Sequence, residues 1–208
     1  MNILSINTAF NQTYVAVKSK TGTFLNCMDS SLKQSENLLG LIDETLKQAN
    51  INAQQLDKIA CVIGPGSFTG IRIGVGVCKG LCFGKNVLRC GINSLDLLAY
   101  TFAQTQSSTD FLVVLNALSV NLFARKFDKN GNPVSECELI SGEEVDIVTG
   151  VVVGLEEEQL EVCNNYVSFS AKDLLNYSET LQSGLNFVPL YLRKSQAETE
   201  LDKKNANN

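Results

Sequence analysis

Hydrophobic positions in the first thirty residues fall into three short runs. Runs rich in β-branched and aromatic residues occupy residues 2–7, 13–18 and 23–28, and polar or glycine-containing linkers separate them at residues 11–12 and 21–22. Such runs with turn residues between them are typical of strands joined as hairpins. The chain is therefore predicted to open with a hairpin meander of three strands.

A change to helical spacing follows at residues 32–50. Apolar residues there recur at steps of three and four, at Leu38, Leu39, Ile42, Leu46 and Ala49. This spacing places them in one stripe of an amphipathic helix. The pattern then predicts, in order, a strand at 58–63, a helix at 69–83, a strand at 87–92 and a helix that is capped by Ser94 and runs through Phe102.

The second half of the chain repeats the three-strand opening. A polar, Ser/Thr-rich stretch at residues 104–109 is the predicted boundary between two lobes. Strand-like runs then recur at residues 111–115, 121–125 and 137–140, so the architecture of the opening is repeated although its residues are not. The hydrophobic pattern therefore predicts two related α/β halves.

Two further strand-like runs, at residues 147–153 and 166–169, bracket the acidic residues 156–158. Acidic side chains are favoured near the positive end of a helix, so this segment is predicted to be the solvated start of a helix. The predicted organisation is an N-terminal lobe at 1–106, a smaller C-terminal lobe at 107–193 and a flexible tail at 194–208.

Charge and composition narrow the classes of function. The sequence has 208 residues, a net charge of -5 and no histidine. Proteins that grip nucleic acid usually carry a basic field, so any role with RNA is predicted to be indirect. Histidine is the usual general base near neutral pH and the commonest metal ligand. Its absence excludes Ser-His-Asp and Cys-His catalytic sites and histidine metal pairs, and no metal site is predicted.

Seven cysteines stand mostly in apolar runs, and their number is odd. This pattern predicts buried thiols in a reducing compartment and not a disulfide framework. No apolar stretch reaches transmembrane length, and the N-terminus lacks the layout of a signal peptide. We therefore expect a cytoplasmic protein with no membrane partner.

A Gly-Pro-Gly turn separates the strand at 58–63 from the following helix. Pro65 cannot donate a ladder hydrogen bond, so the strand is predicted to stop at Gly64. Ser67 or Thr69 can then cap the helix, whose first N–H groups form a potential anion site. The turn is neither a P-loop nor a Rossmann fingerprint, because the lysine is missing and the glycine spacing is G-x-G-x-x-x-G.

The helix after this turn contains Gly70, Gly74, Gly76 and Gly80. Each glycine in a helix interior costs about 1 kcal/mol relative to alanine, so a compensating contact is expected. Close packing against the protein's own sheet, contact with a partner subunit and contact with a small ligand are the three alternatives. One helix can serve more than one of them.

Residues 64–74 resemble the signature of the TsaB (also called YeaZ) family. The resemblance extends to residues 91–95, to residues 98–99 and to residues 189–193, so it touches both ends of the chain in order. It implies an α/β fold of the actin-like/sugar-kinase/Hsp70 type, with two ribonuclease-H-like lobes and mixed central sheets. Members are inactive homologues of the TsaD/Kae-type proteins, and the older label of glycoprotease is discounted for a chain without histidine.

The resemblance further implies a role in making N6-threonylcarbamoyladenosine at position 37 of tRNAs that read codons starting with A. A TsaB-type protein would support the TsaD-type catalytic subunit together with a TsaE-type ATPase, and would form a homodimer when alone. Contact with tRNA would be indirect, through the complex. No cofactor would be required, and weak ATP or ADP binding at a partner interface stays open.

The sequence departs from the family pattern at two places. Asn7 stands where related ATPases have an aspartate near nucleotide-bound Mg²⁺, and Asn116-Ala117-Leu118 replaces the usual opening of the second lobe. A neutral amide gives magnesium much weaker help than a carboxylate. These departures favour a non-catalytic subunit over the alternative, an ATPase or kinase-like enzyme of the same superfold, and no catalytic residue is predicted.

Two sets of site residues are predicted. The predicted partner or dimer interface consists of Leu38, Leu39, Ile42, Leu46, Gly70, Gly74 and Gly76. The predicted motif loop, with a weak nucleotide or anion contact, consists of Gly64, Pro65, Gly66, Ser67, Phe68, Thr69 and Arg72.

Overall fold

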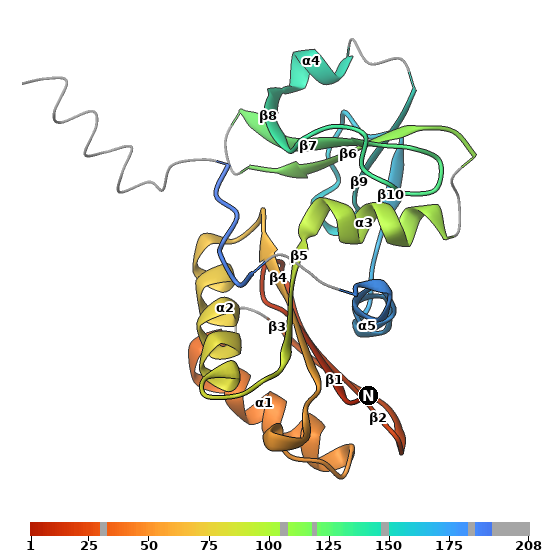
Figure 1. Ribbon diagram of the computed structural model, residues 1–208. Coiled ribbons are helices and arrows are strands. Elements are labelled where there is room, and N and C mark those ends of the chain that lie inside the picture. Colours follow the sequence, from red (N-terminus) through yellow and green to blue (C-terminus); the bar gives the residue numbers. More distant parts are fainter. Residues whose placement is uncertain (30–32, 105–107, 118–119, 147–149, 183–185, 193–208) are drawn as a thin grey trace, which may run out of the picture.

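The protein folds as two five-stranded mixed sheets with helices packed against them (Figure 1). The computed structural model describes residues 1–29, 33–104, 108–117, 120–146, 150–182 and 186–192. The predicted lobe boundary after residue 106 and the predicted tail at 194–208 lie outside the described residues.

The first sheet has the strand order β3-β2-β1-β4-β5. Its strands are β1 (Ile3–Asn7), β2 (Gln12–Ser19), β3 (Gly22–Asp29), β4 (Lys58–Gly64) and β5 (Leu88–Asn93). Strands β1, β2 and β3 pair antiparallel, which confirms the predicted meander, whereas β4 and β5 run parallel to β1. Every residue of β1 and β4 is buried, because helices cover both faces of the sheet at its centre.

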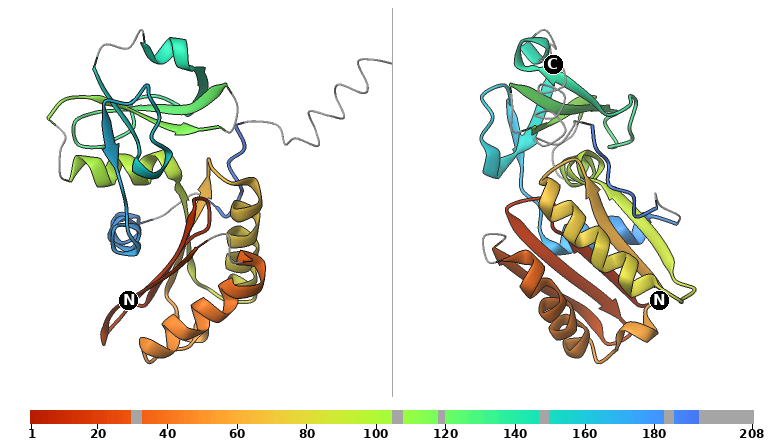
Figure 2. Two further views of the ribbon diagram at one scale, coloured as in Figure 1. Left: turned by 180° about the vertical axis from the view of Figure 1, so that it is seen from behind. Right: turned by 90° about the vertical axis from the view of Figure 1, so that its left-hand side faces the viewer.

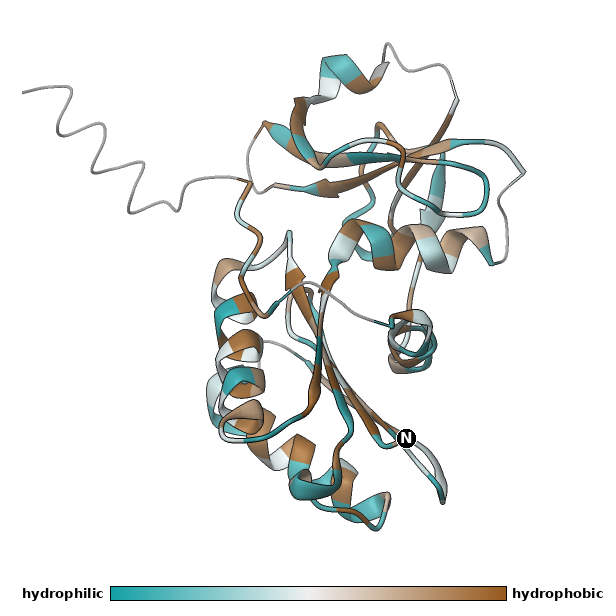
Figure 3. Cartoon of the chain, viewed as in Figure 1, coloured by the Kyte–Doolittle hydropathy of each residue, from teal (hydrophilic) through white to brown (hydrophobic). Residues whose placement is uncertain are grey.

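The second sheet repeats this arrangement. Its order is β10-β9-β6-β7-β8, so β6 occupies the central place of β1 and β9 that of β4. Its strands are β6 (Phe111–Asn116), β7 (Asn121–Phe127), β8 (Glu138–Ser141), β9 (Val151–Leu155) and β10 (Asn165–Val167). The repeat confirms the prediction of two related α/β halves, and β4 and β6 are hydrophobic along most of their length (Figure 3).

Helices α1 (Gln34–Gln48) and α2 (Phe68–Cys82) cover one face of the first sheet, and α5 (Ala171–Thr180) covers the other (Figure 2). Helix α3 (Ser94–Ala103) lies between the two sheets and contacts β6 and β7. The remaining helical elements are α4 (Gly142–Asp146) and the short 3-10 helices η1 (Ala53–Gln55) and η2 (Glu156–Glu158).

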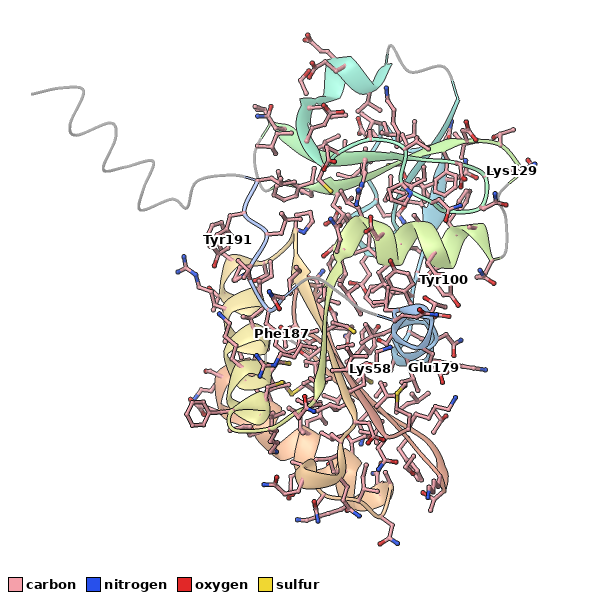
Figure 4. The ribbon with its side chains drawn as sticks, in the orientation of Figure 1. Lys58, Tyr100, Lys129, Glu179, Phe187 and Tyr191 are labelled. Atoms are coloured by element: carbon pink, nitrogen blue, oxygen red, sulfur yellow. The ribbon has the colours of Figure 1, made fainter. Side chains whose placement is uncertain are left out.

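The two halves exchange their last helices. Helix α3 ends the first repeat but packs on the second sheet, and α5 ends the second repeat but packs on the first. The fully buried Lys58 of β4 donates from Nζ to the carbonyl oxygens of Ser178 (2.6 Å) and Leu181, at the C-terminal end of α5 (Figure 4). A cation is favoured at that end of a helix. Because α3 and α5 each pack on the sheet of the other half, the main hydrophobic core is continuous across both sheets.

Three predicted boundaries are corrected. Helix α3 is capped by Asn93, whose Oδ1 accepts from the N–H of Leu95 (2.8 Å), and Ser94 is its first residue and not its cap. In place of the predicted strand at 147–153, β9 begins at Val151 and ends at Leu155. Residues 147–149 lie outside the described part of the chain. The predicted strand at 166–169 ends at Val167.

Candidate functional site

The Gly-Pro-Gly turn follows β4 at its buried end. Gly64 and Gly66 have φ angles of 112° and 156°, and a β-carbon at Gly66 would lie 2.7 Å from the carbonyl oxygen of Ala9. A side chain is therefore unfavourable at both positions. The Gly64–Pro65 peptide is cis. Ser67 caps α2 by accepting from the N–H of Gly70 (3.2 Å), which confirms one of the two predicted caps.

One face of α2 packs directly on the end of β1. A β-carbon at Gly70 would overlap the carbonyl oxygen of Thr8, and one at Gly74 would overlap the Thr8 hydroxyl oxygen. The Thr8 hydroxyl donates to the carbonyl oxygen of Gly70 (2.7 Å), and Gln34 Nε2 donates to the carbonyl oxygen of Thr8 (3.3 Å). Gly70 and Gly74, hereafter the packed pair, let α2 approach Thr8, directly after β1, because they place no side chain of α2 between them.

The opposite face of α2 is open. Gly76 and Gly80 are exposed, and a β-carbon at either would meet no atom within 4 Å in the described structure. On the neighbouring helix α1, Leu39 is 57% exposed and Gly40 is exposed with equal space around it. We call Gly76 and Gly80 the open pair.

Burial divides the predicted interface residues into two groups. Five of them are buried under the protein's own atoms, namely Leu38, Ile42, Leu46, Gly70 and Gly74. The apolar stripe of α1 packs on the first sheet, and this contact removes its apolar area from water. Leu39 and Gly76 are accessible, and their interface role stays a prediction.

A C-terminal strap, residues 186–192, runs along α2 back to the turn (Figure 1). The N–H of Leu190 donates to the carbonyl oxygen of Ile63 (2.8 Å), which joins the strap to the end of β4. Tyr191 stacks on Phe68 with ring centroids 4.4 Å apart and planes inclined by 1°. Arg72 donates from Nε to the Tyr191 hydroxyl (2.8 Å), with its guanidinium 5.0 Å from the Phe68 ring centroid.

The contacts of the strap bring together two stretches that carry the family resemblance, residues 64–74 and the described part of residues 189–193. These stretches are far apart in the chain, and the spacing of residues gives no sign that they touch. The structure brings Phe68 and Arg72 of the predicted motif loop together with Tyr191, on the outside of the turn. Their contacts serve to hold the strap.

A cleft of about 320 Å³ lies where the two halves meet. It is lined by Ala9, Phe10, Asn11, Gln34, Gly66, Ser67, Thr69, Leu115, Asn116, Leu155 and Glu158. Of the predicted motif loop, Gly66, Ser67 and Thr69 reach this cleft, and Gly64 and Pro65 are buried behind it. Whether a nucleotide or another anion binds here stays a prediction.

The charge of the cleft comes from Glu158, the one ionisable side chain among its described lining residues. Its Oε2 accepts from the N–H of Asn116 (2.8 Å). Burial raises the pKa of Glu158 above its usual range, against the lowering effect of that hydrogen bond. The prediction of a solvated helix start is therefore wrong for this residue, because η2 is a single 3-10 turn that directs Glu158 toward the cleft.

Glu158 was missed as a site residue, although the repeat contains a signal for it. The glycine turn follows β4, and η2 follows β9, the equivalent strand of the second sheet. Segments that follow equivalent parallel strands reach the same cleft in folds of this kind. A carboxylate at this place opposes the binding of phosphate groups.

Asn7 ends β1 close to the cleft, and both ends of its side-chain amide are used. Its Nδ2 donates to the carbonyl oxygen of Gln12 (2.9 Å), and its Oδ1 accepts from the N–H of Ala9 (3.1 Å). The side chain is fully buried. Asn7 therefore stabilises the turn between β1 and β2 and directs no oxygen to a cation in the cleft.

Among the described residues, no group of three or more Cys, Asp or Glu side chains is arranged to hold a metal ion. None of the helices in this part of the chain has the length and apolar character needed to cross a membrane.

Comparison with known proteins identifies the family. A family model described as "TsaD: tRNA N6-adenosine threonylcarbamoyltransferase" matches residues 28–193. The tRNA threonylcarbamoyladenosine biosynthesis protein TsaB of Buchnera aphidicola (subsp. Schizaphis graminum) is 30% identical over 115 residues, which are 55% of each chain. The protein of the same name from Escherichia coli K12 is 24% identical over 134 residues, 64% of this chain and 58% of that protein.

The chain thus spans a little over half the length of these two curated relatives. The solved structure of YeaZ from Pseudomonas aeruginosa superposes with a TM-score of 0.76 at 20% identity, over 92% of this chain and 99% of that one. This likeness confirms the two-lobed fold. The match over residues 28–193 shows that the chain belongs to the TsaD family, in which proteins named TsaB are among its relatives.

Proposed function

We propose that the chain is a non-catalytic subunit that supports a TsaD-type catalytic subunit in forming N6-threonylcarbamoyladenosine at position 37 of tRNAs that read codons starting with A. The names of the curated relatives support the pathway, and the match to the TsaD family supports the nature of the partner. The complex would act in the cytoplasm with a TsaE-type ATPase, and tRNA would bind through the partner, since this chain has a net charge of -5.

The non-catalytic role is supported mainly by the neutral charge, burial and hydrogen bonds of the Asn7 side chain. Enzymes that transfer or hydrolyse phosphates hold Mg²⁺ with hard, anionic oxygens. Here the side chain at the end of β1 is neutral and buried, and its oxygen and nitrogen bond the backbone of Ala9 and Gln12. Glu158 adds a negative charge across the cleft, which repels a phosphate. Any ATP or ADP would bind weakly, and at a partner interface.

The open face of α1 and α2 is the proposed partner surface. Glycine without neighbours lets a second helix approach the backbone closely, and an exposed leucine supplies an apolar anchor. Gly76, Gly80, Gly40 and Leu39 provide both features on adjacent helices. The same surface would pair two copies of this chain when the TsaD-type subunit is absent.

The second candidate is an ATPase or kinase-like activity in the cleft. The observation that favours it is the cleft itself, because ligands of folds of this kind bind where the two halves meet. Its lining hydroxyls, Ser67 and Thr69, can donate to an anion. Fold alone does not decide between the two functions.

Affinity purification from lysate tests the main proposal. The TsaD-type subunit is expected to co-purify with the wild-type chain and not with the variant Leu39→Glu, which is expected to fold. Retention of the TsaD-type subunit by Leu39→Glu and by Gly76→Glu would contradict the proposed surface. Magnesium-dependent ATP turnover by the isolated chain would instead support the second candidate.

A further inference from the structure

Two adjoining hollows lie between the C-terminal end of α2, strand β5 and the start of the strap. The first, of about 390 Å³, is lined in part by Lys79, Phe83, Arg89 and Val188. The second contains Lys85 and Leu88, and it shares Arg89 and Asn186 with the first. The two hollows share Arg89 and Asn186 in their walls, and together we call them the α2–β5 groove.

The α2–β5 groove exposes apolar side chains that the fold does not use. Phe83 is 88% exposed and Val188 is 62% exposed, and both line the first hollow. Phe187, next to Val188 in the chain, is buried between α2 and β5 and anchors this part of the strap (Figure 4). Single exposed apolar residues are common on proteins. Two that share one hollow are typical of a surface that binds an apolar side chain.

Lys79 and Arg89 line the same hollow as these apolar residues, Lys85 lines the second, and none of the described lining residues of either hollow is acidic. Arg89 Nη2 lies 3.5 Å from the carbonyl oxygen of Cys82, and Lys85 Nζ donates to that of Ala53 (3.1 Å). The negative C-terminal end of α2 attracts the guanidinium of Arg89. Lys79 has no hydrogen bond or ion pair with the described residues, and its charge is available to a ligand.

Strand β5 gives the groove one more property. It is the outer strand of the first sheet on this side, so one edge of its backbone has no partner among the described strands. Such an edge can bind an extended segment through main-chain hydrogen bonds, with pockets selecting alternate side chains. The side chains of Leu88 and Arg89 are exposed along this edge.

We propose that the α2–β5 groove binds an extended, acidic segment of a partner protein that carries an apolar anchor residue. The anchor would contact Phe83 and Val188, and its flanking carboxylates would pair with Lys79 and Arg89. The described lining of the groove is basic although the chain has a net charge of -5, so the groove would attract carboxylates. Three cations are few for a nucleic-acid backbone, which favours a peptide.

Fluorescence anisotropy with the isolated full chain tests this proposal without the TsaD-type subunit. The probe is a labelled ten-residue peptide of alternating glutamate and leucine. We expect saturable binding that Lys79→Glu and Phe83→Ser each weaken about tenfold, as for a close charge pair or an anchor residue. The matched controls Lys20→Glu and Val120→Ser, at exposed positions elsewhere, are expected to bind as the wild type does.

Several outcomes would overturn the proposal. These are no saturable binding, equal binding of a lysine–leucine peptide, equal weakening by the control variants, and stronger binding of a uridine decamer. Stronger binding of a synthetic peptide of residues 193–208 would assign the groove to the chain's own C-terminus. Concentration-dependent self-association that Phe83→Ser abolishes would assign it to a second copy. Failure of the proposed tRNA role leaves the probe result unchanged.

Discussion

The two glycine pairs of α2 differ in what surrounds them. Gly70 and Gly74 contact Thr8 so closely that no side chain fits, whereas a β-carbon at Gly76 or Gly80 would meet no atom of another described segment within 4 Å. The close contact of the packed pair with Thr8 offsets the free-energy cost of glycine in a helix. The open pair has the same cost of about 1 kcal/mol per residue relative to alanine, and no described contact within the chain offsets it. Contact with a partner would offset this cost, which is why we propose the open pair as part of the partner surface.

The largest effect is expected from Gly70→Ala. The new β-carbon would overlap the carbonyl oxygen of Thr8, a backbone atom that cannot rotate away. Separation of α2 from β1 should cost about 3 kcal/mol of the free energy of unfolding. Urea denaturation measures it, with Gly76→Ala as the matched control. A loss below about 1 kcal/mol would show that the packed pair is not needed for packing.

The open pair is expected to control association and not folding. Gly76→Glu places a charged side chain on the proposed partner surface, where α2 has free space. Affinity for the TsaD-type subunit should fall about 100-fold, or about 2.7 kcal/mol, while the thermal unfolding temperature stays near that of the wild type. Surface plasmon resonance measures the affinity, and Val120→Glu is the control. Unchanged affinity would place the partner elsewhere.

Alanine at the open pair tests the helix cost itself. Gly76→Ala and Gly80→Ala should each stabilise the isolated chain by about 0.5–1 kcal/mol, because alanine loses less backbone entropy and meets no atom. Calorimetry of the two single variants and the double variant measures the gain. A destabilised Gly76→Ala would mean that the open face already has a contact within the monomer.

The cleft beside the packed pair gives the smallest expected effect. Burial raises the pKa of Glu158, so the folded protein holds this proton more tightly than the unfolded chain does. The ionised carboxylate therefore costs stability at neutral pH, and the cost fades as pH falls below the ordinary glutamate pKa of about 4.3.

Glu158→Gln should accordingly raise the unfolding temperature slightly at pH 7.5 and have no effect near pH 4. Its amide oxygen can still accept from the N–H of Asn116. Thermal scans across this pH range measure the difference between variant and wild type. A gain that grows as pH falls would contradict the assigned direction of the pKa shift.

The hydrophobic pattern predicted the strands and helices of the first half to within a few residues. The periods of two and 3.6 are strong there, because each strand or helix buries one defined face or stripe. The second half was predicted less well. Strand β9 was expected too early, and η2 was expected to begin a solvated helix. The sequence gives no sign that Glu158 accepts from the N–H of Asn116, 42 residues away.

The sequence located the motif loop between β4 and α2, but it did not show which faces of α1 and α2 are exposed. Periodicity places Leu38, Ile42 and Leu46 on one face of α1, but it does not say whether that face meets the sheet or a partner. Glycine content likewise did not separate the packed pair from the open pair. The contact of Tyr191 with Phe68 joins residues 123 positions apart, and no local pattern encodes it.

Reconstituted modification of tRNA tests the central claim most directly. Purified TsaD-type and TsaE-type proteins would be given tRNA and the threonylcarbamoyl donor, with or without this chain, and N6-threonylcarbamoyladenosine would be measured by mass spectrometry. We predict product only when this chain is present with the TsaD-type subunit, none from this chain alone, and none when Gly76→Glu replaces the wild type. Full product without this chain, or product from this chain alone, would contradict its role as a non-catalytic supporting subunit.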